Sequence, residues 1–150
     1  MLIKNKQGKI IFDGDQTSLF LDDPDLREAV LEGVVMQGAR FDGANLEGAN
    51  LRGADFYWGG FCATNLTSAD LEGAQLQGAN FKEANLTNAN LRNANLGRDN
   101  LGGSTQLQGA ILTSTNLKFT NLEGAEYDSK TIFPEKFSPQ QAKMILREKS

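Results

Sequence analysis

The residues that could carry covalent chemistry are few and scattered. The chain of 150 residues contains no histidine and a single cysteine, Cys62. A serine or cysteine nucleophile needs a base within hydrogen-bonding reach, and without histidine that base would have to be a lysine or a carboxylate. The sequence pairs no such groups, and the position of Cys62 within its repeat points the thiol outward. We therefore expect no catalytic residues and a protein that is not an enzyme.

Two short stretches could instead bind a metal ion or a phosphate. The acidic residues at 13, 15, 22, 23 and 25 could offer oxygen ligands to a hard cation, but they lack the spacing of a calcium-binding loop. The stretch from Gly102 to Thr105 is glycine-rich, but no lysine follows it, so the signal of a phosphate-binding loop is absent. Zinc and haem sites built on histidine or paired cysteines are excluded by composition. We expect no metal ion and no cofactor.

The elements that would position any functional group follow a five-residue period. Leucine or phenylalanine recurs at every fifth residue from Phe41 to Leu101, and after one extra residue the period continues from Leu107 to Tyr127. Five steps advance about 500° around a helix, and an odd step reverses the face of a strand, so neither element keeps these side chains together. A bend in every pentad solves the problem, and glycine, asparagine or serine two residues after each central residue suits such a bend. The pattern predicts a coil.

The number of pentads in each coil follows from which side chains would stack. A step of twenty residues places Phe41, Phe61 and Phe81 in one interior column and alternates basic and acidic residues on the outside. A step of fifteen gives no such alternation. Stacked coils lie about 4.8 Å apart. The sequence therefore favours four pentads per coil and a rod of roughly 20 Å, a little over four coils at that spacing.

These features resemble the pentapeptide-repeat proteins. The family's motif, alanine followed by asparagine or aspartate and then leucine, is carried here by Ala44-Asn45-Leu46, Ala49-Asn50-Leu51, Ala54-Asp55-Phe56 and Ala84-Asn85-Leu86, among others. The resemblance covers residues 39–128. It implies an all-β solenoid, namely a right-handed quadrilateral β-helix, whose four sides per coil agree with the stacking argument.

The segment before the repeat, residues 1–38, is predicted to cap one end of the coil, because a solenoid otherwise exposes its core. Apolar residues at 2–3 and 10–12 flank a turn at residues 6–9 and predict a β-hairpin. Residues 24–36 predict a helix, with Pro24 at its first position and apolar residues at helical spacing. A competing interpretation extends the five-residue register back through Met36 and Leu31, which would leave Val30 and Val35 on the outside.

The segment after the repeat, residues 129–150, is predicted to contain a short helix. Ser138 and Pro139 are typical of a helix start, and the residues that follow include an apolar stripe of Ala142, Ile145 and Leu146. This stripe could cover the last coil. Alternatively, it could join two rods end to end, so that the C-terminal region forms a homodimer interface.

Two interruptions of the repeat supply the candidate functional residues. At the first, Tyr57 and Trp58 occupy outward positions and Gly59 replaces the inward alanine. Steps of twenty place Trp58 and Arg98 in one outer column, which Phe119 would continue after the one-residue insertion. Aromatic and arginine side chains are enriched in protein interfaces. Our candidate interaction surface is therefore Tyr57, Trp58, Arg98 and Phe119.

The second interruption runs from Arg98 to Gln106. Here Asp99 takes an inward alanine position, and a buried carboxylate is costly unless it is paired. Either Arg98 or local backbone donors would satisfy it, or the coil bulges and Asp99 reaches water. The irregular positions of the two interruptions together are Gly59, Asp99, Gly102, Gly103 and Ser104.

Function is much less determined than fold. A regular rod without catalytic groups favours a scaffold for protein–protein interaction, with a protein partner, no direct nucleic-acid binding and no membrane association. The resemblance implies an alternative, since some family members mimic DNA, bind DNA gyrase or topoisomerase IV and protect against fluoroquinolones. Duplex DNA carries about one charge per 1.7 Å, or about twelve over a rod of this length. Residues 41–128 carry a net charge of only −5.

The expected location is the cytoplasm. The first residues lack the long apolar core of a signal peptide, and no apolar run approaches the roughly 18 residues of a membrane span. Direct nucleic-acid binding is not expected, because the repeat region is acidic and the only net-basic segment is residues 129–150, with a net charge of +3.

Overall fold

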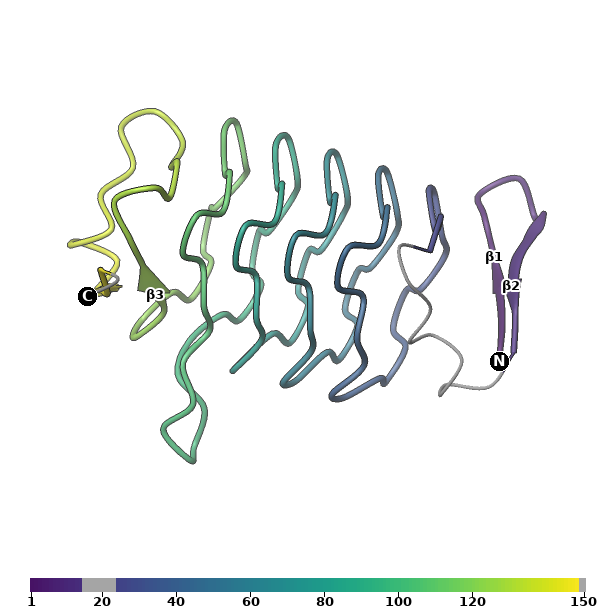
Figure 1. Ribbon diagram of the computed structural model, residues 1–150, viewed down its shortest axis with the longest axis horizontal. Coiled ribbons are helices and arrows are strands. Elements are labelled where there is room, and N and C mark those ends of the chain that lie inside the picture. The colour runs from purple at the N-terminus through teal and green to yellow at the C-terminus, as the bar shows by residue number, and fades with distance from the viewer. Residues whose placement is uncertain (15–23, 149–150) are drawn as a thin grey trace.

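The computed structural model describes residues 1–14 and 24–148 and shows a rod of stacked coils (Figure 1). Parallel bridges join each coil to the next, and from Asp25 to Asn95 they pair residues 20 apart, as in Asn45 with Asn65 and Asn65 with Asn85. Twenty residues are four pentads, so each coil has four short sides. The four-sided coil predicted from stacking is therefore the observed one.

The corners of the coil explain why asparagine or aspartate precedes each central residue. Asn45 accepts a hydrogen bond on Oδ1 from the backbone N–H of Glu47 at 3.1 Å, and Asn50 does the same for Arg52 at 3.2 Å. The next residue turns the chain with a positive φ, as at Gly48 with φ of 66°. Asparagine and aspartate are suited to such local bonds, and glycine adopts a positive φ without a steric penalty. Each pentad thus encodes its own bend.

The interior is filled by the central residues and the alanines beside them. Phe41 and Phe61 stack with ring centroids 5.4 Å apart, and Phe61 and Phe81 stack at 4.8 Å with an interplanar angle of 5°. Phe56 meets Phe61 edge to face at 5.5 Å. Where threonine replaces the inward alanine, its hydroxyl donates to a backbone carbonyl of the previous coil, as Thr64 Oγ1 does to the Phe41 oxygen at 2.7 Å. The buried polar atom is then satisfied.

The helix predicted for residues 24–36 is wrong. From Asp25 onward the chain already follows the coil, and Asp25 bridges Asn45 just as Val30 bridges Asn50. Leu26, Leu31 and Met36 are buried as central residues, whereas Val35 is 68% exposed. Hydrogen bonds and burial along the coil outweighed the unfavourable exposure of the valines. The repeat therefore begins near residue 25 rather than at residue 39, and the competing register was the correct one.

The N-terminal hairpin covers the first coil. Strand β1 (Leu2–Lys4) pairs antiparallel with strand β2 (Ile10–Asp13), with an irregular register between Ile3 and Lys4. Asn5 continues beyond β1 and bridges Ala29, and the buried side chain of Ile3 joins the core cluster. Figure 1 shows the hairpin at one end of the rod, opposite the C-terminus.

The predicted C-terminal helix is also absent. Ser138 accepts a hydrogen bond on Oγ from the N–H of Gln141, which is a helix-start contact, but only a turn follows. Lys143 has a φ of 56°, and this conformation ends the turn. Strand β4 (Ile145–Leu146) then pairs in parallel with strand β3 (Glu126–Tyr127), so the tail adds a partial coil to the rod.

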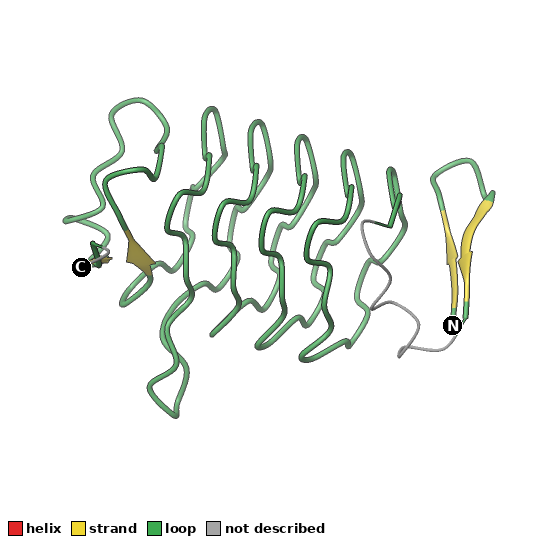
Figure 2. Ribbon diagram, in the orientation of Figure 1, coloured by secondary structure: helices red, strands yellow, loops and turns green. Residues whose placement is uncertain are grey.

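The tail packs against its own chain. Phe133, Phe137 and Ala142 lie against the core cluster, and Met144 belongs to it. Dimerisation through this region stays a prediction. Across the described residues the chain forms short strands, turns and loops (Figure 2). These residues contain no helix that is long and apolar enough to cross a membrane.

Candidate functional site

Tyr57 and Trp58 form a corner of the rod, where the backbone must turn. Trp58 has a φ of 59°, a conformation that the equivalent residues of neighbouring coils reach with glycine, at Gly38 and Gly78. The indole lies flat over Gly78, close enough that a Cβ there would stand 3.1 Å from Trp58 Cε2. Trp58 remains 50% exposed, and the Tyr57 ring lies 6.4 Å from it between centroids. A large aromatic surface is thus presented to solvent.

Gly59, the next irregular position, has a packing explanation. A Cβ at this inward position would stand 2.8 Å from Phe61 Cε2 and 2.9 Å from the backbone oxygen of Phe56. Two central phenylalanines therefore take the space that an alanine methyl occupies elsewhere. This glycine belongs to the core and not to a functional surface.

The second interruption is larger than the spacing of leucines suggests. Bridged residues are 20 apart up to Gln75 and Asn95, but 26 apart at Asn80 and Gln106. Six residues are therefore inserted, not one, and they leave the rod as a loop. Leu101, which fits the five-residue period in the sequence, lies in this loop and is 86% exposed. In Figure 1 the loop projects well beyond the outline of the other coils.

Asp99 holds the loop together from within. Its Oδ1 accepts the backbone N–H of Leu101 at 2.8 Å and that of Gly103 at 2.5 Å, while its own N–H donates to the Gly103 oxygen at 2.9 Å. The residue is only 8% exposed, and its Oδ2 is buried without a hydrogen-bond partner among the described residues. Of the alternatives left open by the sequence, local backbone donors are the ones observed, and they bond one oxygen of this carboxylate, Oδ1.

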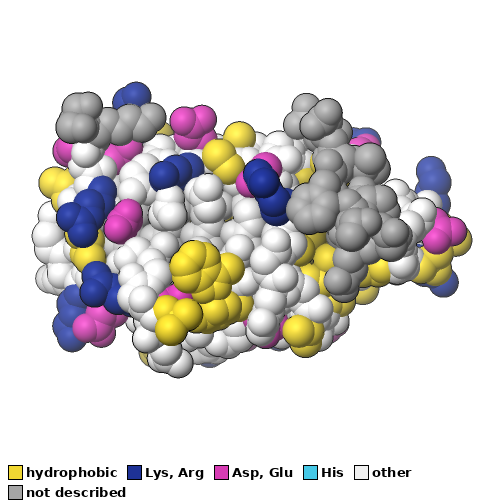
Figure 3. Space-filling view, turned by 60° about the horizontal axis from the view of Figure 1, so that its bottom comes forward, with side chains coloured by type: hydrophobic (Ala, Val, Ile, Leu, Met, Phe, Trp, Pro, Cys, Tyr) yellow, Lys and Arg dark blue, Asp and Glu magenta, His cyan; other side chains and the backbone are white. Residues whose placement is uncertain are grey.

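The loop leans on the tryptophan of the earlier coil. A Cβ on Gly103 would stand 2.6 Å from Trp58 Cζ2 and 2.6 Å from Asp99 Oδ2, so only glycine fits between them. The two interruptions, about forty residues apart in the chain, thus form one surface. Figure 3 turns this side of the rod forward and shows a compact group of hydrophobic side chains on it. We call Tyr57, Trp58 and residues 98–104 the Trp58 edge.

The predicted column of Trp58, Arg98 and Phe119 forms only in part, because Phe119 does not belong to it. The bridges from Asp55 to Gln75 and from Gln75 to Asn95 keep Arg98 in register with Trp58. Because six residues are inserted after Arg98, the next residue in that column is Gly124, whose Cβ would lie 3.1 Å from Arg98 Nε. Phe119 lies in the column of Asn93, since the Asn93 N–H donates to the oxygen of Lys118. Phe119 therefore belongs to a different corner. The sequence analysis did not identify Leu101 as a surface residue. The only sign of it in the sequence is the pair of glycines, Gly102 and Gly103, that follows Leu101.

The structure places some of the residues that could bind a metal ion or act as a nucleophile. No three histidine, cysteine, aspartate or glutamate side chains within residues 1–14 and 24–148 come together as metal ligands. Asp15, Asp22 and Asp23 of the acidic stretch lie outside the described residues. Cys62 is partly buried, and burial together with the Asp42 carboxylate raises the pKa of its thiol, so little thiolate forms at neutral pH.

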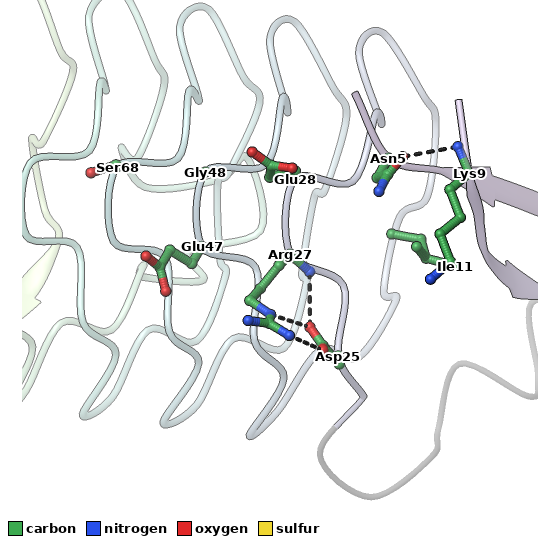
Figure 4. A pocket seen from close by; sticks show the side chains of 9 residues that line it. All are labelled: Asn5, Lys9, Ile11, Asp25, Arg27, Glu28, Glu47, Gly48 and Ser68. Atoms are coloured by element: carbon green, nitrogen blue, oxygen red, sulfur yellow. Dashed lines mark hydrogen bonds and ion pairs between the residues drawn. The ribbon is translucent and has the colours of Figure 1, made fainter. Parts of the chain in front are cut away.

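A cleft of about 470 Å³ lies between the hairpin and the first coils (Figure 4). Asp25 and Arg27 lie side by side on the coil that lines it, with Arg27 Nη2 2.7 Å from Asp25 Oδ2. Hydrogen bonding to the Arg27 guanidinium lowers the pKa of Asp25. These two charges satisfy each other. Lys9, Glu28 and Glu47 also line the cleft and form no ion pair within the described residues.

The class of protein defined by this geometry is a solenoid of five-residue repeats with closed ends and one inserted loop. The sequence pattern of the pentapeptide repeats matches residues 25–58 and 63–98 in eight copies. The chain belongs to the pentapeptide-repeat family, whose members fold as right-handed β-helices.

Solved structures agree with this assignment. The pentapeptide repeat protein Rfr23 from the cyanobacterium Cyanothece 51142 is 40% identical, with a TM-score of 0.60, over 66% of this chain and 63% of that one. This chain thus spans less than two thirds of Rfr23. A pentapeptide repeat protein from the Arabidopsis thaliana thylakoid lumen is 29% identical, with a TM-score of 0.53, over 87% and 78% of the two chains.

A third relative, a pentapeptide repeat protein from Nostoc, is 30% identical over 84% of this chain and 83% of its own, with a TM-score of 0.40. Among curated proteins, none matches the sequence significantly.

Proposed function

We propose that this protein is a rigid, non-enzymatic scaffold that binds a protein partner through the Trp58 edge. The observation that carries the proposal is the six-residue loop, which exposes Leu101 and packs Gly103, two residues further on, against the half-exposed indole of Trp58. A soluble rod gains no packing from a leucine at the tip of a projecting loop. Exposed aromatic and aliphatic side chains that lie together are typical of protein interfaces.

The loop is also preorganised for binding. Asp99 bonds two of its amides, and Gly103 is wedged against Trp58 and Asp99. Ordering a loop on binding usually costs free energy, and a loop that is already ordered avoids most of that cost. The rigid coil beneath it fixes the direction in which Leu101 points.

Charge argues against the alternative of DNA mimicry. The repeat region from residue 25 to residue 128 contains thirteen acidic and seven basic residues, a net charge of −6. Five coils of about 4.8 Å span about 24 Å, over which duplex DNA carries about fourteen charges. Some acids are also neutralised by neighbours, as Glu72 is by Arg52 at 2.7 Å. In a gyrase supercoiling assay we expect neither inhibition nor protection.

Deleting residues 99–104 tests the proposal directly. Joining Arg98 to Thr105 restores the five-residue register, because Gln106 already bridges Asn80 and Thr105 is already buried. The deletion variant should therefore fold as an uninterrupted rod. Its circular dichroism spectrum and unfolding midpoint provide the check.

Binding is then compared among immobilised wild type, the deletion variant and Leu101→Ser, using the cytosolic fraction of the source organism, since the cytoplasm is the location we propose. A partner should be recovered at least tenfold less with both variants. Leu2→Ser is the matched control, because Leu2 is another exposed leucine and belongs to strand β1, at the N-terminal end of the rod (Figure 1). Equal recovery of every protein by wild type and deletion variant would remove the Trp58 edge from consideration.

A further inference from the structure

Phe119 is exposed at a corner that usually carries a small residue. Its φ is 60°, and the residues stacked in the same column are Gly53, Gly73 and Asn93. A bulky side chain is strained in this conformation. The ring is 68% exposed, so packing does little to offset the strain. Because most of the ring is exposed, it is available to a partner outside the chain.

Two positive charges flank the ring. Lys118 Nζ lies 5.1 Å from the ring centroid and the guanidinium carbon of Arg92 lies 5.8 Å from it. The backbones of Arg92 and Lys118 are neighbours in adjacent coils, since the Asn93 N–H bonds the Lys118 oxygen. Like charges so placed repel each other.

Neither cation has an acidic partner within the described residues. The nearest acid in the column, Glu72, is taken by Arg52 at 2.7 Å and also accepts from Asn90 at 3.4 Å. Among residues 1–14 and 24–148, no carboxylate lies within ion-pair distance of Arg92 or Lys118. A patch with two uncompensated positive charges therefore surrounds an exposed ring on a rod that is otherwise acidic.

We infer that Arg92, Lys118 and Phe119 bind an acidic segment of a protein partner, whose carboxylates pair with the two cations while an apolar side chain packs on the ring. The inference rests on the proposed function in that the partner is a protein, but its site is separate from the Trp58 edge. Neutralising both cations removes their mutual repulsion, which favours an acidic ligand.

Two other kinds of acidic ligand fit the patch less well. Nucleic acid would bring a continuous row of phosphates against a repeat region of net charge −6, and two cations cannot offset that repulsion. A membrane surface needs several basic residues and a larger apolar face for stable attachment. A short acidic peptide can place its carboxylates beside Arg92 and Lys118 alone, and so avoids most of the repulsion from the acidic repeat region.

The test measures the binding of a fluorescently labelled peptide by anisotropy. The peptide has glutamates around a central leucine–phenylalanine pair, and a second peptide replaces each glutamate by lysine. We expect the full-length protein to bind only the acidic peptide, and more weakly as salt is raised. Arg92→Glu with Lys118→Glu should weaken binding at least tenfold, and Phe119→Asn about threefold or more.

The charge-matched control changes Lys6 and Lys9 of the hairpin turn to glutamate and should alter affinity less than twofold. The Arg92→Glu and Lys118→Glu variant should in turn bind the lysine peptide. Equal binding of the acidic peptide by wild type and this double variant would overturn the inference. Tighter binding of single-stranded DNA or anionic vesicles through the same residues would overturn it in favour of those ligands.

The two proposals can fail separately. Deleting residues 99–104 should leave binding of the acidic peptide unchanged, because Phe119 lies at a different corner from the loop. If the deletion abolishes partner recovery while the peptide does not bind at all, the Trp58 edge stands and the Phe119 patch falls.

Discussion

Trp58 and Phe119 are two large aromatic residues in the same backbone conformation, with φ of 59° and 60°. Both occupy corners that neighbouring coils fill with small or polar residues, and both are exposed, Trp58 by 50% and Phe119 by 68%. Their surroundings differ. The Trp58 indole lies on Gly78 and against Gly103, whereas the Phe119 ring is flanked by Lys118 and Arg92.

The difference separates structural from functional explanations of an exposed ring. The contacts of Trp58 with Gly78 and Gly103 offset part of the energetic cost of its positive φ. A structural role within the chain therefore explains part of why a tryptophan occupies this corner. The Phe119 ring is 68% exposed and its neighbours are charged, so packing offsets less of its backbone strain. We therefore propose that the loop makes the main contact with a partner at the Trp58 edge. At Phe119, we propose that the ring itself makes this contact.

Replacing each ring by asparagine compares the two corners most directly, and the larger effect is expected for Trp58→Asn. Removing a half-buried indole loses about 3 kcal/mol of apolar burial, while relief of the strained backbone returns about 1 kcal/mol. The free energy of unfolding should fall by about 1–2 kcal/mol, measured by chemical denaturation. An unchanged value would mean that the indole does not support the loop.

Asp99→Ala tests whether the loop depends on its own carboxylate as well as on Trp58. The variant leaves the N–H groups of Leu101 and Gly103 without their acceptor, which should cost about 1 kcal/mol. Cleavage in the loop by a protease should become faster. Asp99→Asn is the matched control, because its amide oxygen can still accept both bonds. If both variants are cleaved as slowly as wild type, Trp58 alone holds the loop.

Much of the rod could be predicted from the sequence, because the same local rule recurs in every pentad. The stacking of Phe41, Phe61 and Phe81 follows from the twenty-residue step alone. The predicted helix at residues 24–36 failed where two periods compete, since Leu26 and Val30 fit a helix while Leu26, Leu31 and Met36 fit the coil. Pairing with the following coil decides between them, and that contact is not local.

The size of the insertion was hidden for a similar reason. Leu101 follows Asp99 and Asn100, so the inserted pentad imitates the motif and appears to continue the repeat. Only the pairing of Gln106 with Asn80 shows that this leucine has left the core. Once six residues are counted, Phe119 moves to its own corner, and the predicted interaction column separates into two sites.

Phe119→Asn gives the smallest expected change in stability and the sharpest contrast with Trp58→Asn. Asparagine tolerates a positive φ, so relief of strain should roughly balance the small burial of the ring, and the free energy of unfolding should stay constant or rise by up to about 0.5 kcal/mol. The same variant should lose affinity for the acidic peptide. A residue whose removal weakens binding without weakening the fold is retained for binding. A loss of stability above about 1 kcal/mol would instead show that the ring packs on the rod as Trp58 does.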